Sequence, residues 1–307
     1  AGAAAACAAG IAPLHVGSDG AGSIRIPASF TGIFGIKASF GRVPAYPSSP
    51  MGLLSNVGPM TRNVRDAAAM LNVLARPDHR DPYALPPDDH DYLAGIDDGV
   101  RGWRVAYSPT LGYAKVNPEI AAACASAAKQ FEDLGATVEE VGAIFPTPRE
   151  ALLTLWAAGA AIVLSGFPKR QHSLCDPGFV AVAAEGEQIR AIDYVAADMV
   201  RTALGQRMAQ FHQRYDLLLT PMMPVAALPT GQDLNDPSTE RSWIDWSPFS
   251  YPFNMTRQPA ASVPCGLTRA GLPIGLQIVG PLYGEDRVLR AARAFETTQP
   301  QRRPPLD

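Results

Sequence analysis

The chain has 307 residues and a mass of 32.6 kDa, and 47% of its residues are hydrophobic while only 18% are charged. Globular proteins average about 25% charged residues, so a chain of this composition can bury a large core and global disorder is excluded. With 26 basic and 29 acidic residues the net charge is -3, so the composition has no basic excess of the kind that indicates binding to nucleic acids or anionic membranes.

The N-terminal quarter contains two predicted helices. An Ala-rich segment predicts a helix over Gly2 to Ala9, and the short apolar run Leu14 to Val16 follows it. A second helix is predicted over Val64 to Ala75, where Asn63 caps the first turn and Asp66 stands at the capping-box position. Each of these segments is closely followed by a glycine or a proline, which helices rarely continue through.

The middle of the chain reads as one βαβ unit. Gly102 to Tyr107 has the pattern of a short strand, and a helix opens at Pro118 and closes at Gly135. A second strand is predicted over Thr137 to Val141. Strand, helix and strand in this order predict a parallel pair of strands.

The uncharged stretch from Ala151 to Pro168 is 18 residues long, which is close to the minimum of about 20 residues for a membrane span. Thr154, Gly159 and several other small or polar residues interrupt it, and much of the rest is alanine. We therefore predict a buried helix or an oligomer contact here in preference to a membrane span.

The C-terminal third alternates helices and strands. Apolar residues recur at helical spacing between Ile189 and Phe211, and Asp216 to Thr220 has the pattern of a buried strand. Ala261 to Cys265 and Ile274 to Val279 are predicted strands of a hairpin, and a last helix is expected over Glu285 to Thr297. No convincing linker divides these elements, so we predict a single mixed α/β domain over residues 1–307.

One segment combines features that acyl-transfer chemistry needs, the run Gly17-Ser-Asp-Gly-Ala-Gly-Ser23-Ile-Arg-Ile-Pro27. Gly20, Ala21 and Gly22 leave the backbone N–H groups almost unscreened beside the Ser23 hydroxyl, as an oxyanion hole beside a nucleophile requires. A phosphate-binding loop would need Lys where Ser23 stands, and the Gly-x-Ser-x-Gly elbow of α/β-hydrolases is absent. From composition alone, a Gly-rich structural turn is the simplest interpretation.

The order of several longer motifs favours a specific family. The run Gly17–Ala28, followed by Phe30-Thr-Gly-Ile-Phe-Gly-Ile-Lys37, resembles the signature of the amidase signature family. Tyr215–Pro221, Trp246–Asn254 and Gln258–Pro264 are similar to the C-terminal half of that family, as is Gly271–Gly280. The resemblance implies the amidase-signature fold, a large mixed, twisted β-sheet flanked by helices.

The resemblance also implies roles for the residues of the Gly-rich segment. Ser23 matches the nucleophile that forms an acyl-enzyme, and the backbone N–H groups of Gly20, Ala21, Gly22 and Ser23 match the oxyanion hole. In the family a second serine relays the nucleophile's proton to a neutral lysine, and no cofactor or metal takes part. We expect Asp19 and Arg25, which flank the loop, to hold it through hydrogen bonds and to take no part in the chemistry.

Two features depart from the family pattern. The family usually has a larger residue where Gly20 stands and glycine where Ala21 stands, so the Ala21 methyl needs a negative φ or enough room. The segments for the relay serine and the catalytic lysine would precede Ala1, and the lysines of this chain are Lys37, Lys115, Lys129 and Lys169. Lys37 belongs to a different family segment, so we expect the N-terminal part of the fold to be missing and the chain alone to be inactive.

Several other candidate sites have simpler interpretations. The run Ser126-Ala-Ala-Lys129 is interpreted as a coincidence on a helix surface. His15 is interpreted as a packed histidine, and the acidic run Asp88–Asp91 as a solvated loop. The aromatic residues that might line an acyl pocket are interpreted first as core residues: Trp156, Trp243, Trp246, Phe249 and Tyr251. The cysteines are far apart in sequence, so neither a disulfide framework nor a zinc site is predicted: Cys7, Cys124, Cys175 and Cys265.

We therefore predict a cytoplasmic amidase that uses Ser23 to cleave a small-molecule carboxamide to a carboxylate and ammonia or an amine. Its expected partners are the substrate and the missing N-terminal segment, with a homodimer left open; nucleic acid and a membrane span are not expected. Two alternatives stay open, a subunit of the tRNA-dependent amidotransferase that passes ammonia to a partner, and a non-catalytic fragment.

Overall fold

The fold is described by a computed structural model that covers residues 1–87 and 89–299. Its strands are β1 (Leu14–Asp19), β2 (Phe34–Lys37), β3 (Asn56–Thr61), β4 (Arg104–Tyr107), β5 (Thr137–Glu140), β6 (Leu217–Pro221), β7 (Ala260–Leu267) and β8 (Pro273–Val279). Its α-helices are α1 (Gly2–Ala8), α2 (Arg25–Thr31), α3 (Val64–Leu74), α4 (Pro118–Asp133), α5 (Arg149–Ser165), α6 (Pro177–Glu187), α7 (Ala191–Phe211), α8 (Pro252–Met255) and α9 (Glu285–Glu296). Two 3-10 helices, η1 (Gly52–Leu54) and η2 (Lys169–Leu174), complete the elements of the described residues.

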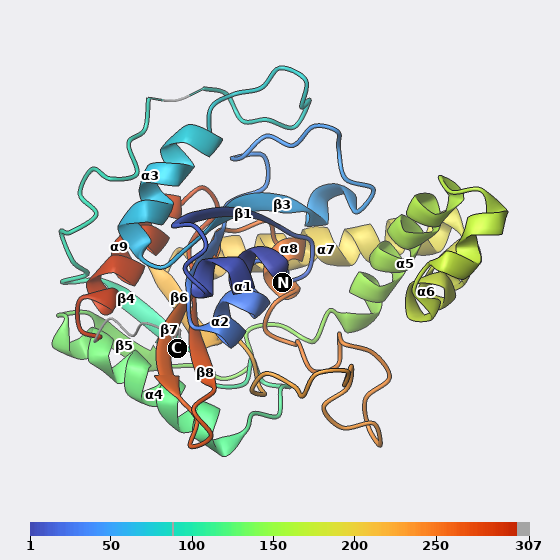
Figure 1. The fold of residues 1–307 in the computed structure, drawn as a ribbon. Helices are drawn as coiled ribbons and strands as arrows, with labels where there is room; N and C mark the ends of the chain where they lie inside the picture. The colour runs from blue at the N-terminus through green and yellow to red at the C-terminus, as the bar shows by residue number, and fades with distance from the viewer. Residues whose placement is uncertain (88, 300–307) are drawn as a thin grey trace.

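Within the described residues the strands form one eight-stranded mixed sheet in the order β1-β3-β2-β7-β8-β6-β4-β5 (Figure 1). β1, β3 and β2 are antiparallel neighbours, whereas β4 is parallel to both β5 and β6. The β7–β8 hairpin lies between these two parts and pairs antiparallel with β2 on one side and β6 on the other. The hairpin therefore joins the N-terminal and C-terminal halves of the sheet.

Helices cover both faces of the sheet. In β6, Leu217 and Leu219 point into the core that contains α3, α4 and α9, while Leu218 points into a second core that contains α5, α7 and α8. This is the alternation of a strand that is buried on both faces. Helix α2 contacts β2, β7 and β8, which places that helix over the middle of the sheet.

Most predicted elements are confirmed. The Asn63 side chain caps α3 by accepting a hydrogen bond from the N–H of Asp66 at 2.8 Å. β4, α4 and β5 form the predicted parallel unit, and β7 and β8 form the predicted hairpin. The predicted α/β fold class is likewise what the structure has, a large mixed sheet flanked by helices.

The uncharged stretch after Glu150 belongs to α5, which packs against α6 and α7 and projects with α6 away from the sheet (Figure 1). In the described part of the chain, no helix combines the length and apolar character that crossing a membrane requires. The helix predicted between Ile189 and Phe211 is α7, but the apolar side chains of its first half, such as Ile192 and Met199, are exposed.

Candidate active site

The Gly-rich segment forms the connection between β1 and α2. Strand β1 ends at Asp19, residues 20–24 turn, and α2 begins at Arg25. Ser23 lies in this turn and is exposed, whereas Asp19, Ala21, Gly22 and Arg25 are buried. The turn thus presents the Ser23 hydroxyl to solvent, while the residues around Ser23 are buried.

Asp19 and Arg25 form a completely buried ion pair beneath the turn. The Asp19 carboxylate accepts hydrogen bonds from the Arg25 Nε at 2.9 Å and the Arg25 Nη2 at 3.0 Å. It also accepts a hydrogen bond from the backbone N–H of Gly22 at 2.7 Å. The pair therefore holds the backbone of the turn directly, through the carboxylate.

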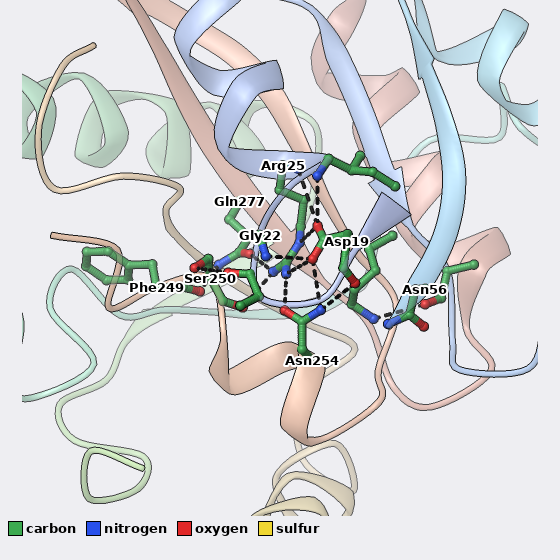
Figure 2. Close-up of polar contacts among 12 residues, drawn as sticks. Asp19, Gly22, Arg25, Asn56, Phe249, Ser250, Asn254 and Gln277 are labelled. Atoms are coloured by element: carbon green, nitrogen blue, oxygen red, sulfur yellow. Dashed lines mark hydrogen bonds and ion pairs between the residues drawn. The ribbon is translucent and has the colours of Figure 1, made fainter. Parts of the chain in front are cut away.

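Every donor of the Arg25 guanidinium has a partner (Figure 2). Besides the two bonds to Asp19, Nη1 donates to the carbonyl oxygen of Ser250 at 2.9 Å and to Gln277 Oε1 at 2.8 Å. Nη2 also donates to Asn254 Oδ1 at 2.6 Å. A guanidinium has five N–H donors, and a buried charge is tolerated only when such groups are satisfied.

Asn254 and Gln277 extend this network to distant parts of the chain. The Asn254 amide donates to the carbonyl oxygen of Asp19 at 2.9 Å and to that of Leu54 at 3.0 Å. The Gln277 amide donates to the carbonyl oxygen of Phe249 at 2.9 Å and to Thr220 Oγ1 at 3.0 Å. The turn is consequently tied to α8, β6 and β8.

The electrostatics of the network keep Asp19 charged. Burial by itself raises the pKa of Asp19, but the adjacent Arg25 charge and the hydrogen bonds from Arg25 and Asn254 outweigh it and lower the pKa to about 2. The Asp19 carboxylate is therefore ionised at neutral pH, and in that form it accepts the hydrogen bonds that hold the turn.

The backbone N–H groups of the turn differ in their availability. Gly22 already donates to Asp19, which differs from the expectation of four available oxyanion donors. Within residues 1–87 and 89–299, the N–H groups of Gly20, Ala21 and Ser23 donate no hydrogen bond, and neither does the Ser23 hydroxyl. Three N–H donors of the same turn and one hydroxyl are thus available to a ligand.

Glycine is required at position 22 and not at position 21. Gly22 has φ +134°, and a Cβ there would lie 2.5 Å from Ile26 Cδ1 and 2.8 Å from Ser250 Cβ. Ala21 is not among the described residues with positive φ, and its methyl group is buried among apolar side chains. Ala21 is therefore compatible with the conformation of the turn. The hydroxyl of Ser250 also donates to the carbonyl oxygen of Ala21 at 2.6 Å.

No lysine of the described residues hydrogen-bonds to Ser23. Lys37 is completely buried, and its Nζ donates to the carbonyl oxygens of Ala38, at 2.9 Å, and Gln258. Burial, together with the charge of Arg25, lowers the pKa of Lys37 to about 7, although Asp19 and Glu285 oppose that change. Lys115, Lys129 and Lys169 are exposed.

The other candidate residues lie apart from this network. Ser126 and Lys129 are exposed on α4, and His15 Nε2 lies 3.2 Å from the carbonyl oxygen of Ala12. The described residues contain no group of three or more acidic, His or Cys side chains that could hold a metal, and Asp88 of the predicted acidic loop lies outside them. All four cysteines are free.

The aromatic candidates divide into two groups. Phe249 and Tyr251 are core residues, as interpreted from the sequence, and Trp246 stacks on Phe30. Trp156 and Trp243 are half-buried and lie edge-to-face with ring centroids 5.5 Å apart. Trp156 also lies against the Ser23 turn, because a Cβ at Gly20 would be 3.2 Å from its Cζ3.

A model of the protein family described as Amidase matches residues 1–289. The chain belongs to the amidase signature family. An acylamidase of Rhodococcus erythropolis is 36% identical to this amidase signature chain, over 97% of this chain and 64% of that protein. A glutamyl-tRNA(Gln) amidotransferase subunit of Myxococcus xanthus is 35% identical over 92% of this chain and 63% of that protein. Among solved structures, a bacterial aryl acylamidase of the amidase signature family matches with a TM-score of 0.90 and 31% identity, covering 98% of this chain and 65% of that one.

The amidase signature chain thus spans about 64% of the length of the acylamidase it matches. The resemblance found in the sequence is confirmed, and so is the fold it implied. Sequence reasoning did not single out Asn254, Gln277 or Ser250 as site residues. The signal was present, because Asn254 and Gln277 stand inside the segments that carry the resemblance.

Proposed function

We propose that this chain carries the nucleophile of an amidohydrolase that cleaves a carboxamide C–N bond. Ser23 Oγ attacks the carbonyl carbon, and its proton passes to a base. The C–N bond then breaks, the leaving amine or ammonia takes up a proton, and an acyl-enzyme remains. Water hydrolyses that ester, releases the carboxylate and returns the proton to Ser23.

The observation that carries this proposal is the exposed Ser23 next to three unpaired backbone N–H groups, those of Gly20, Ala21 and Ser23. Such donors stabilise the negative charge that develops on the carbonyl oxygen, and removing one oxyanion donor costs about 100–1,000-fold in kcat in a well-studied protease. Asp19 supports the site by fixing the turn, since its carboxylate accepts hydrogen bonds from the backbone N–H groups of Gly22 and Ile24. Arg25 in turn holds that carboxylate through two side-chain hydrogen bonds.

The base is proposed to come from outside residues 1–307. The described lysines are either exposed or, for Lys37, bonded to backbone carbonyls away from Ser23. A relay serine and a neutral lysine supplied by another segment would complete the site, and residues 1–307 alone would then be inactive. The cytoplasmic location and a homodimer stay predictions.

The experiment is active-site labelling with a fluorophosphonate, read by intact mass, together with amide hydrolysis. It compares the natural polypeptide containing residues 1–307 with the 32.6 kDa chain itself. We expect one probe on Ser23 in the natural polypeptide, none in Ser23→Ala, and none in the 32.6 kDa chain. Ser126→Ala is the matched control, because Ser126 is an exposed serine on α4, and it should leave labelling and turnover unchanged. Undiminished turnover in Ser23→Ala would overturn the proposal.

A second candidate is a protein that releases ammonia from glutamine for a partner. The 35% identity to an amidotransferase subunit favours it, whereas the run Ser250–Ala260 is similar to stand-alone amidases. Co-purification with a second polypeptide and glutamine-dependent transfer of ammonia would favour this candidate over the first. Hydrolysis of simple carboxamides by the isolated polypeptide would favour the first.

A further inference from the structure

Trp156 occupies the space beside the Ser23 turn that a side chain at position 20 would otherwise fill. A Cβ built on Gly20 would lie 3.2 Å from Trp156 Cζ3 and 3.6 Å from Cη2. The first distance is shorter than nine in ten of the contacts that Cβ atoms make in proteins. Because Gly20 has no Cβ, the edge of the indole can lie next to the backbone. The fit between Gly20 and Trp156 is therefore close, and a methyl group at position 20 would require the indole to shift by a few tenths of an ångström.

Two contacts of α5 with other segments hold the indole in this position. Trp243 packs edge-to-face on Trp156, and the Arg149–Asp245 ion pair, with Nε–Oδ1 at 2.7 Å, ties the start of α5 to the segment that carries Trp243. One turn further along α5, Gly159 packs so closely on Met51 that a Cβ there would lie 2.6 Å from the Met51 sulfur. Trp156 is thus a positioned side chain and not a mobile surface residue.

The indole is also placed where a substrate would meet it. Trp156 is half-buried, so part of its surface stays accessible, and the side chain packs on the same apolar cluster as Ala21. Gly20 and Ala21 supply two of the three unpaired N–H groups of the turn. A carbonyl oxygen bound by those groups would bring the rest of the substrate next to an apolar ring surface.

We propose that Trp156 and Gly20 together form one side of the acyl pocket and select an apolar acyl group whose size the indole limits. This inference rests on the function proposed above. The acyl group is assigned in preference to the amine because it stays on Ser23, with its carbonyl oxygen at the turn, after the amine has left. The indole ring is apolar, so it favours binding of an apolar acyl group. In such a pocket, one methylene more or less on the substrate changes kcat/KM by about 10–200-fold.

The test uses the natural polypeptide that contains residues 1–307 and two series of amides, one with acyl groups from acetyl to octanoyl and a constant aniline, the other with a constant acetyl and varied amines. We expect Trp156→Ala to raise the octanoyl-to-acetyl ratio of kcat/KM at least tenfold and to leave the amine series unchanged. Trp103→Ala is the matched control, because Trp103 packs against the opposite core beneath Arg290. It should leave both series unchanged.

A second comparison does not depend on turnover. Gly20→Ala should lower the melting temperature of the protein, and it should do so less when Trp156→Ala removes the ring that the new methyl group meets. Equal decreases in both backgrounds would overturn the close fit. If Trp156→Ala does not fold, Trp156→Leu serves in its place.

The outcomes separate this inference from the proposed function. Absence of fluorophosphonate labelling at Ser23 contradicts the function itself. Normal labelling and hydrolysis with an unchanged acyl ratio in Trp156→Ala, or a change confined to the amine series, overturns only the acyl-pocket assignment.

Discussion

The hydroxyl of Ser250 donates a hydrogen bond to the carbonyl oxygen of Ala21 across 229 residues of sequence, at 2.6 Å. Ala21 stands between Gly20 and Gly22 in the turn that presents Ser23, so this bond fixes the Ala21–Gly22 peptide plane. The two adjacent peptides carry the unpaired N–H groups of Ala21 and Ser23. The same hydroxyl lies 2.9 Å from the carbonyl oxygen of Ser247. A side chain outside the Gly-rich segment thus sets the orientation of its backbone.

Ser250→Ala should therefore lower amide hydrolysis about tenfold while the protein stays folded, because a lost buried hydrogen bond is worth about 1–3 kcal/mol and the turn loses a constraint. The measurement is kcat for the natural polypeptide, with circular dichroism to check the fold. Ser247→Ala is the control, since the Ser247 hydroxyl donates only to Ile244 O, at 3.3 Å. Equal kcat values in the two variants would contradict this role for Ser250.

Asp19→Asn should destabilise the protein by about 3–5 kcal/mol, because it leaves the Arg25 charge buried without its counter-ion. The measurement is the free energy of unfolding in urea. Asp193→Asn is the matched control, since the Arg190–Asp193 pair is exposed, with side-chain exposures of 75% and 46%. That variant should change the free energy by less than about 1 kcal/mol.

The same ion pair has a defined pH dependence. Because the pKa of Asp19 is lowered to about 2 in the folded protein, its contribution is present above the unfolded pKa of about 3.9 and is lost as the pH falls from there toward 2. If Asp19→Asn lowered the free energy of unfolding at pH 7 by less than about 1 kcal/mol, the ion pair would contribute little to stability.

Gly22→Ala should destabilise the protein more than the same change at Gly231. Both glycines have positive φ, which costs alanine about 1–2 kcal/mol, but no atom of the described residues lies within 4 Å of a Cβ at Gly231. At Gly22 the methyl group also meets Ile26 and Ser250, which adds about 1–3 kcal/mol of overpacking. Urea unfolding of the two variants measures the difference, and equal losses would mean that the turn can move to accept the methyl group.

The free energy of unfolding should decrease as the pH falls from about 6.5 toward 4, because of His212. Burial lowers the pKa of His212 to about 4, although the hydrogen bond to Tyr215 opposes this, and Nε2 has no partner in the described part of the chain. Since the unfolded chain binds the proton first, with a pKa of about 6.5, lowering the pH from about 7.5 to about 5 favours unfolding by about 1–2 kcal/mol.

His212→Asn should remove this part of the pH dependence, measured as the difference in urea unfolding between about pH 7.5 and about pH 5. His79→Gln is the control, because His79 is exposed. A pH dependence in His212→Asn equal to that of the unsubstituted protein would assign the change to other groups.

Several elements that were predicted from the sequence have local signals, whereas two that were missed, α2 and β3, lack them. Asn63, Pro118 and the hairpin turn indicate α3, α4 and β7–β8 through residues that stand at their ends. Helix α2 has no side-chain cap and no acidic residue in its first turn. Strand β3 contains Pro59, which strand patterns usually exclude, and pairing on both sides decides its conformation.

The parts of the candidate site differ in the same way. The turn with Ser23 is contiguous, so its chemistry is visible in the sequence. Its partners Ser250, Asn254 and Gln277 are brought to Arg25 across 225 to 252 residues. Neither periodicity nor local propensity carries information about such pairings, because the topology of the sheet creates them.

The position of the β7–β8 hairpin between β2 and β6 has a consequence for synthesis on the ribosome. A nascent chain that has emerged only as far as β6 holds two separate groups of strands, with the place of the joining hairpin still empty. Arg25 is made early, yet Gln277 on β8 can accept from it only after β8 has emerged. The hairpin therefore joins the two groups of strands and completes the hydrogen bonds of Arg25 together, so a chain released before β8 emerges lacks both.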